Sequence, residues 1–192
     1  MVGLRNISAG GTLKNGMNTD KKANTQPSEF LRDCMADAVM RLLKQYPMDK
    51  IQVKQICEAS GYHRASWFRA FRSKSEAVTY HMVRLWQQWS ERHGVAVRDA
   101  FTIDNAEAFF QYNYEVRDTL RLLYQRGLMV ELAASFTATM LTPHEDDPVR
   151  AYQASMHAFS LYGILREWIV RDFDQPPATM AAITRQATAE MV

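Results

Sequence analysis

Apolar residues recur every three or four positions along most of the chain, the spacing of one buried face of an α-helix. The first such segment runs from Phe30 to Leu43, and Ser28 just before it is a suitable N-cap. It ends before Tyr46 and Pro47, because a residue that precedes proline is driven out of the helical region. We find no alternating strand pattern, so the sequence predicts an all-α fold.

Caps and helix breakers divide the remainder into further helices. Two short helices are expected at about 51–59 and 63–71, separated by Gly61, which can adopt the left-handed conformation that ends a helix. Ser73 to Glu76 have the pattern of a capping box, which predicts a long helix that breaks near Gly94 or Asp99.

Four more helical segments complete the predicted set. One begins at Asp104 and continues to Leu123, and a largely apolar one spans 128–141. Asp147 and Pro148 pair an N-cap with a proline at the first helical position, which predicts a long helix to about Phe173. A short last helix begins after Pro176.

The chain divides into three expected parts. Residues 1–26 are polar and without apolar periodicity, so we expect a flexible N-terminal arm. Residues 27–80 form a small basic unit of three helices and the start of a fourth. Residues 81–192 form a larger C-terminal helical unit.

Composition excludes several classes of protein. Among 192 residues, 47% are hydrophobic, which is ample for a buried core, and two cysteines are too few for a disulfide scaffold. No apolar run reaches the roughly 18 residues of a membrane span, and residues 1–24 hold no apolar signal segment, so we expect a cytoplasmic protein without membrane contact. Phosphate loops, nucleophile elbows and metal-ligand spacings are not found, so we expect no enzyme, no cofactor and no metal site.

Charge is unevenly distributed. The formal net charge is +2, but Arg41 to Lys74 contain eight basic and two acidic residues, a net of +6. Residues 75–192 contain 10 arginines and 15 acidic residues, a net of −5. Such asymmetry is typical of a nucleic-acid-binding segment joined to another unit, although a solvated helical face gives the same sum.

The basic segment has the pattern of a helix-turn-helix. Two short helices joined by a glycine-containing turn place the second helix in a major groove of DNA. Apolar residues are spaced to pack this pair against the preceding helix: Ile51, Ile56, Tyr62, Trp67 and Phe71. Left on the outer side of the second helix are His63, Arg64, Ser66 and Arg69. Arg64 lies near the N-terminal end of this helix, where side chains meet base edges.

This segment resembles the DNA-binding segment of the TetR family of bacterial transcriptional repressors. The positions that match the family pattern are Ile51, Val53, Ile56, Gly61, Phe71, Ser73 and Lys74, with Ala65, Ser66 and Trp67 as close variants. The resemblance implies a homodimer that binds a palindromic operator in double-stranded DNA. The DNA-binding residues that it implies are Gln52, Lys54, His63, Arg64, Ser66, Trp67, Phe68, Arg69 and Lys74.

Four positions depart from the family pattern. Gln52 and His63 replace the usual capping threonine and serine, Phe68 replaces a tyrosine whose hydroxyl commonly contacts phosphate, and Ala70 replaces a histidine. These departures motivate an alternative hypothesis, a helical protein-interaction module that retains the fold without regulated, sequence-specific DNA binding. His63 can contact DNA or be an ordinary surface histidine.

The C-terminal half is rich in aromatic residues and methionine at helical spacing. Such a stripe is typical of a hydrophobic core and also of a pocket for a small-molecule effector. Our candidate pocket residues are Trp86, Trp89, Phe110, Tyr114, Phe136, Met140, Tyr152, Met156, His157 and Phe159.

The end of the chain carries a second resemblance. Phe159 to Gly163, continuing through Trp168 and Ile169, is similar to the dihydroxyacetone-kinase-regulator-like branch of the TetR family. Small residues on the same helix permit close approach of a second helix, either from a dimer partner or from the same chain. The dimer residues that we predict are Ala154, Ala158, Gly163 and Trp168. Together these features predict a ligand-responsive repressor.

Overall fold

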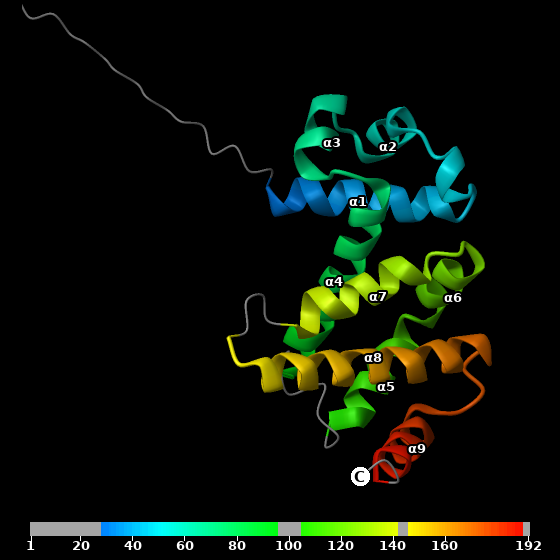
Figure 1. Ribbon diagram of the computed structural model, residues 1–192. Coiled ribbons are helices and arrows are strands. Elements are labelled where there is room, and N and C mark those ends of the chain that lie inside the picture. The colour runs from blue at the N-terminus through cyan, green and yellow to red at the C-terminus, as the bar shows by residue number, and fades with distance from the viewer. Residues whose placement is uncertain (1–27, 96–104, 142–145, 190–192) are drawn as a thin grey trace, which may run out of the picture.

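The computed structural model describes residues 28–95, 105–141 and 146–189, and within these ranges it contains nine α-helices and no strand (Figure 1). The α-helices are α1 (Glu29–Leu43), α2 (Val53–Ser60), α3 (Arg64–Ala70), α4 (Lys74–His93), α5 (Ala106–Glu115), α6 (Arg117–Gln125), α7 (Met129–Met140), α8 (Pro148–Val170) and α9 (Pro177–Ala189). A 3-10 helix spans Met48–Lys50. The all-α prediction is confirmed, and the arm predicted for residues 1–26 lies outside the described ranges.

Three predicted helix starts are confirmed by their caps. Each capping side chain accepts a hydrogen bond from a backbone N–H in the first turn, which satisfies one of the donors that a helix start leaves unpaired. The bonds are Leu31 N to Ser28 Oγ at 3.3 Å, Glu76 N to Ser73 Oγ at 3.0 Å, and Val149 N to Asp147 Oδ1 at 2.9 Å. The Glu76 carboxylate accepts from Arg72 N at 2.7 Å, so the predicted capping box closes on the preceding residue rather than on Ser73.

The helix predicted from Asp104 to Leu123 is two helices, α5 and α6. The break lies at Val116, whose backbone angles are φ −96° and ψ 14°. Arg117 Nη1 donates to Tyr114 O at 2.8 Å, so a side chain binds a backbone carbonyl at this break. The apolar period predicted from the sequence continues across the bend.

Figure 1 shows α2 and α3 at one end of the molecule, on the side of α1 that faces away from α7 and α8. α4 leaves α3, packs against α1 and then against α7, and α9 packs against α5. The helix α4 runs unbroken through residue 80, where the sequence suggested the boundary between the small basic unit and the C-terminal unit. One hydrophobic core connects the two parts, from Met35 and Phe71 to Leu132 and Trp168.

Arg126 joins the turn after α6 to the end of α1. Its Nε donates to Leu43 O at 2.7 Å and its Nη2 to Lys44 O at 3.1 Å. Carbonyls in the last turn of a helix have no partner within the helix, and a cation there also complements the helix dipole. This guanidinium therefore caps α1 from a segment more than 80 residues away.

A polar cluster holds α1 against α4. Arg84 Nη1 lies 3.0 Å from Asp33 Oδ1, and its Nη2 bonds to Asp37 Oδ1. His81 Nδ1 lies 3.0 Å from Asp37 Oδ1, and the Tyr80 hydroxyl donates to Asp33 Oδ1 at 2.8 Å. Burial disfavours the charged form of Asp37, but hydrogen bonds from His81 and Arg84 outweigh it and lower the pKa of Asp37 to about 2.

We expect Asp37→Asn to lower the free energy of unfolding by about 1 kcal/mol at pH 7, a value discounted because this carboxylate is 40% exposed. A lowered pKa stabilises the fold above the unfolded value, near 3.8, and this contribution disappears as the pH falls through about 2. Urea unfolding measured between pH 7 and pH 3 should show that the difference in the free energy of unfolding between the wild type and Asp37→Asn becomes smaller toward pH 3. Asp49→Asn is the control, since Asp49 is exposed and forms an ion pair with neighbouring, exposed Lys50. If that difference in the free energy of unfolding did not change with pH, the ionised Asp37 carboxylate would not be its cause.

Candidate DNA-binding surface and effector cavity

The turn between α2 and α3 depends on Gly61. Its φ is +77°, a left-handed conformation that strains residues with a Cβ, and its N–H donates to Cys57 O at 2.9 Å. Tyr62 N donates to the same carbonyl at 3.2 Å. The chain therefore reverses within three residues, and α3 begins at Arg64 with its N-terminal end outside the core, as the sequence predicts.

Most of the predicted DNA-binding residues are exposed. This set comprises Gln52, Lys54, His63, Arg64, Phe68 and Arg69. Lys54 Nζ lies 3.8 Å from Glu58 Oε1, and Arg69 Nη2 donates to Ser66 Oγ at 3.3 Å. The Arg64 guanidinium lies over the Phe68 ring, 5.4 Å from its centroid. Gln52 N donates to Gln55 Oε1 at 2.7 Å, which satisfies the N-cap N–H of α2 through a side chain.

The exposed face of α3 has an apolar centre and basic edges. Successive residues of an α-helix are turned by about 100°, so Ala65 and Phe68 lie between Arg64 and Arg69 around the helix. Phe68 is 59% exposed at the centre of this face. The face is suited to a partner that offers both negative charge and apolar groups.

Two residues of α3 do not belong to this surface. Trp67 is 2% exposed and packs against Phe71 with ring centroids 5.4 Å apart, and Ser66 is also buried. Both were predicted to contact DNA, and this placement corrects the prediction: residues 66, 67 and 70 form the inner side of a seven-residue helix, opposite Arg64 and Phe68.

Lys74 is engaged within the chain. Its Nζ donates to Met48 O and, at 2.8 Å, to Ile51 O. The ammonium thereby fixes the 3-10 turn before α2 to the start of α4. The phosphate contact expected of Lys74 stays a prediction, and a Lys74 substitution would also disturb this turn.

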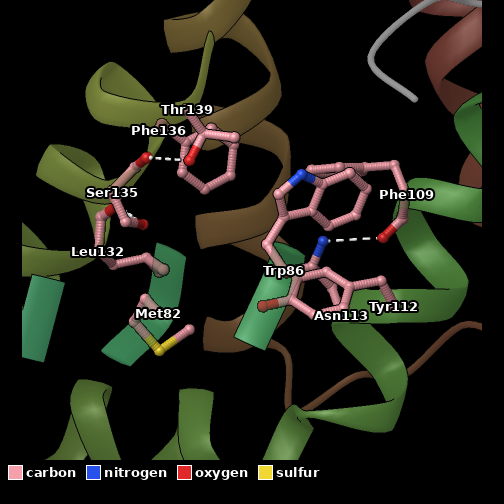
Figure 2. Close-up of a pocket in the computed structure, with 9 residues that line it drawn as sticks. All are labelled: Met82, Trp86, Phe109, Tyr112, Asn113, Leu132, Ser135, Phe136 and Thr139. Carbon is pink, nitrogen blue, oxygen red and sulfur yellow. Dashed lines mark hydrogen bonds between the residues drawn. The ribbon is translucent and has the colours of Figure 1, made fainter. Parts of the chain in front are cut away.

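A small cavity lies between α4, α5 and α7 (Figure 2). Its volume is about 30 Å³, and no lining residue is charged. The lining residues are Met82, Trp86, Phe109, Tyr112, Asn113, Leu132, Ser135, Phe136 and Thr139. Figure 2 shows the side chains from α5 facing those from α7, with Trp86 of α4 between them.

The structure separates the predicted pocket residues into groups. Trp86 and Phe136 line the cavity. Trp89 and Phe110 are buried without lining it, Tyr114 stacks on Trp168 at 6.0 Å, and Met140 is half-buried. On α8, His157 is half-buried, whereas Tyr152, Met156 and Phe159 are exposed and do not line this cavity. The pocket prediction is therefore wrong for these three residues, because they point away from the core.

Seven of the lining residues were not predicted from the sequence. Three of them occur on α7 at positions 132, 135 and 139, on the same helical face as the predicted Phe136, and two of these are Ser135 and Thr139. Asn113 similarly interrupts an apolar stripe on α5. Polar residues at positions where the period demands apolar ones are the signal that marks this cavity.

The predicted dimer residues lie on different sides of α8. Ala158 and Trp168 are each 1% exposed within the single chain, so the prediction of Trp168 as an interface anchor is wrong. Trp168 Nε1 donates to Gln175 O at 3.1 Å. Ala154 is half-buried and Gly163 is exposed.

Comparison with known proteins adds no assignment. No protein-family model matches the chain, and a search of curated proteins finds no matching sequence. Across 28–95, 105–141 and 146–189, the structure contains no helix that is long and apolar enough to cross a membrane. The same ranges contain no cluster of three or more potential metal ligands.

Proposed function

We propose that this protein is a homodimeric transcriptional regulator of the TetR type, a repressor that binds palindromic double-stranded DNA. The observation that carries the proposal is the exposed face of α3, with Arg64 and Arg69 beside Phe68, on a helix presented by a glycine turn. Gln52 and Lys54, at the start of α2, extend this surface. An arginine at this place can donate two hydrogen bonds to guanine, and Phe68 can contact a thymine methyl group.

A second copy of the chain is the partner that we propose for α8. Apolar residues at positions 149, 152, 156 and 159 of this helix are all more than half exposed, and Gly163 continues the same row. Their spacing alternates between three and four residues, the pattern of a helix-packing seam. A palindromic site requires that the two α3 helices of such a dimer be related by its two-fold axis and reach successive major grooves.

The effector of this regulator is proposed to bind in the cavity between α4, α5 and α7. Because the first turn of α4 follows the end of α3 in the chain, and α4 lines the cavity further along, a change in the position of α4 is passed to the DNA-binding surface. Couplings of this kind typically amount to about 1–3 kcal/mol.

The test is selection of DNA ligands from random duplexes, followed by affinity measurements at physiological salt. We expect a palindromic site that is preferred over random duplex, and Arg64→Ala to weaken that preference about 5- to 150-fold. Arg92→Ala is a matched control, since Arg92 is exposed at the far end of α4 from α3. Absence of any preferred sequence would refute the proposal.

The alternative function, a protein-interaction module without regulated DNA binding, is favoured by the same exposed row on α8. A stable heteromeric partner together with absent operator selection would establish it. Sequence-specific DNA binding by the dimer would exclude it.

A further inference from the structure

The walls of the cavity between α4, α5 and α7 are uncharged and largely aromatic. Trp86, Phe109 and Phe136 supply ring faces and edges, and Phe109 and Phe136 meet edge to face with centroids 6.0 Å apart. An ionised ligand would lose its hydration here without gaining a counter-charge, which is strongly unfavourable. The cavity therefore selects neutral molecules, and its rings favour an aromatic one.

Tyr112 contributes a buried hydroxyl to this cavity. The side chain is 5% exposed, and its ring packs edge to face on Trp86 with centroids 4.8 Å apart. Burial raises the pKa of Tyr112, so the hydroxyl keeps its proton. No hydrogen bond joins this hydroxyl to any residue in the described ranges, although buried tyrosine hydroxyls usually have a partner.

Three further polar side chains present acceptors. Ser135 Oγ donates to Leu132 O at 2.6 Å, and Thr139 Oγ1 donates to Ser135 O at 2.7 Å. Asn113 Nδ2 donates to Phe109 O at 2.8 Å. Since these bonds use donors, the hydroxyl oxygens and the amide carbonyl oxygen retain lone pairs for a ligand donor.

We infer that the cavity binds a small neutral aromatic molecule that carries a hydroxyl group, a ligand of the phenol class. Its ring packs among the aromatic walls, and its hydroxyl donates to an acceptor on α7 or α5 and accepts from Tyr112. This ligand is the effector class of the proposed regulator. Only its effect on DNA binding rests on the proposed function, and its binding to the cavity does not.

Binding requires the cavity to enlarge. A volume of about 30 Å³ holds a water molecule or two but not a six-membered ring. Met82 is the lining side chain best able to turn aside, because methionine has an unbranched and flexible chain. Met82 belongs to α4, so ligand entry acts directly on the helix that leads to α3.

Calorimetric titration of the full chain with three matched probes tests the inference without DNA. We expect phenol to bind saturably, anisole to bind about 3- to 10-fold more weakly because it lacks the donor, and benzoate not to bind. Tyr112→Phe should weaken phenol and anisole by similar factors, because the oxygen of each ligand accepts from the Tyr112 hydroxyl. Tyr114→Phe is the control, since Tyr114 lies outside the cavity.

Three results would overturn the inference: equal binding of phenol and anisole, binding of benzoate as tight as that of phenol, or no saturable binding of phenol. Loss of operator selection with phenol binding intact would refute the proposed function alone. Operator selection with no phenol binding would refute the ligand assignment alone.

Discussion

Trp168→Ala should lower the free energy of unfolding by about 3–5 kcal/mol, the largest stability effect that we expect from one substitution. Its indole is fully enclosed by rings, with centroids 5.4 Å from Phe110 and 5.0 Å from Phe173. Removing it leaves a cavity that these rings cannot fill, and it deprives Gln175 O of its hydrogen bond. Urea unfolding followed by circular dichroism at fixed protein concentration measures the loss.

Two companion variants separate packing from other effects. Trp168→Phe keeps most of the apolar volume and should cost about 1–2 kcal/mol. Val170→Ala lies two residues away at an exposed position and should change stability by less than about 0.5 kcal/mol. Two results would support a place for Trp168 in the dimer interface instead. One is a loss of unfolding free energy below about 1 kcal/mol for Trp168→Ala, and the other is a folded variant that only dissociates into monomers.

Met156→Glu should separate the proposed dimer. Met156 lies in the middle of the exposed row on α8 and is 69% exposed in the single chain, so a glutamate there is well tolerated by the monomer. At the centre of an apolar interface the same carboxylate would be desolvated without a partner. We expect the dissociation constant of the dimer to rise at least about 100-fold, as measured by sedimentation equilibrium, with operator affinity falling in parallel.

Val130→Glu is the matched control for this substitution. Val130 is 78% exposed on α7, outside the α8 row, so a new carboxylate there should leave the oligomeric state unchanged. A Met156→Glu chain that stays folded and dimeric would show that α8 does not form the interface. Dissociation by both variants would indicate a general charge effect instead.

Helix ends were the most predictable part of this fold. Ser28, Gly61, Ser73 and Asp147 act on backbone groups within a few positions of themselves, so the local sequence contains all of the relevant atoms. The break at Val116 was missed because the apolar period continues through it and only the backbone changes direction.

The orientation of α8 was beyond prediction for a physical reason. This helix is apolar on two faces, one with Leu161 and Trp168 and one with Tyr152 and Met156. Periodicity shows that both faces exist, but which of them is buried depends on the helices that pack against it from elsewhere in the chain. As a result, Tyr152, Met156 and Phe159 are exposed rather than directed into a pocket, and Ala158 and Trp168 are buried within the chain.

The cavity was predictable only in part. Trp86 and Phe136 were identified because large aromatic residues are conspicuous, whereas Asn113, Ser135 and Thr139 depend on the meeting of α5 with α7. Likewise, Lys74 is basic by sequence, but its hydrogen bonds to Met48 O and Ile51 O follow from a turn more than 20 residues away.

The continuous core, together with the Arg126 cap on α1, has a consequence for cooperativity. An independent folding unit needs its own enclosed apolar interior, but here α1 and α4 share theirs with α7 and α8. Separating α1, α2 and α3 from the other helices would expose apolar surface in both parts at once and release Leu43 O and Lys44 O from Arg126. We therefore expect the described helices to open together, so that the free energy of opening the end that holds α2 and α3 approaches that of global unfolding.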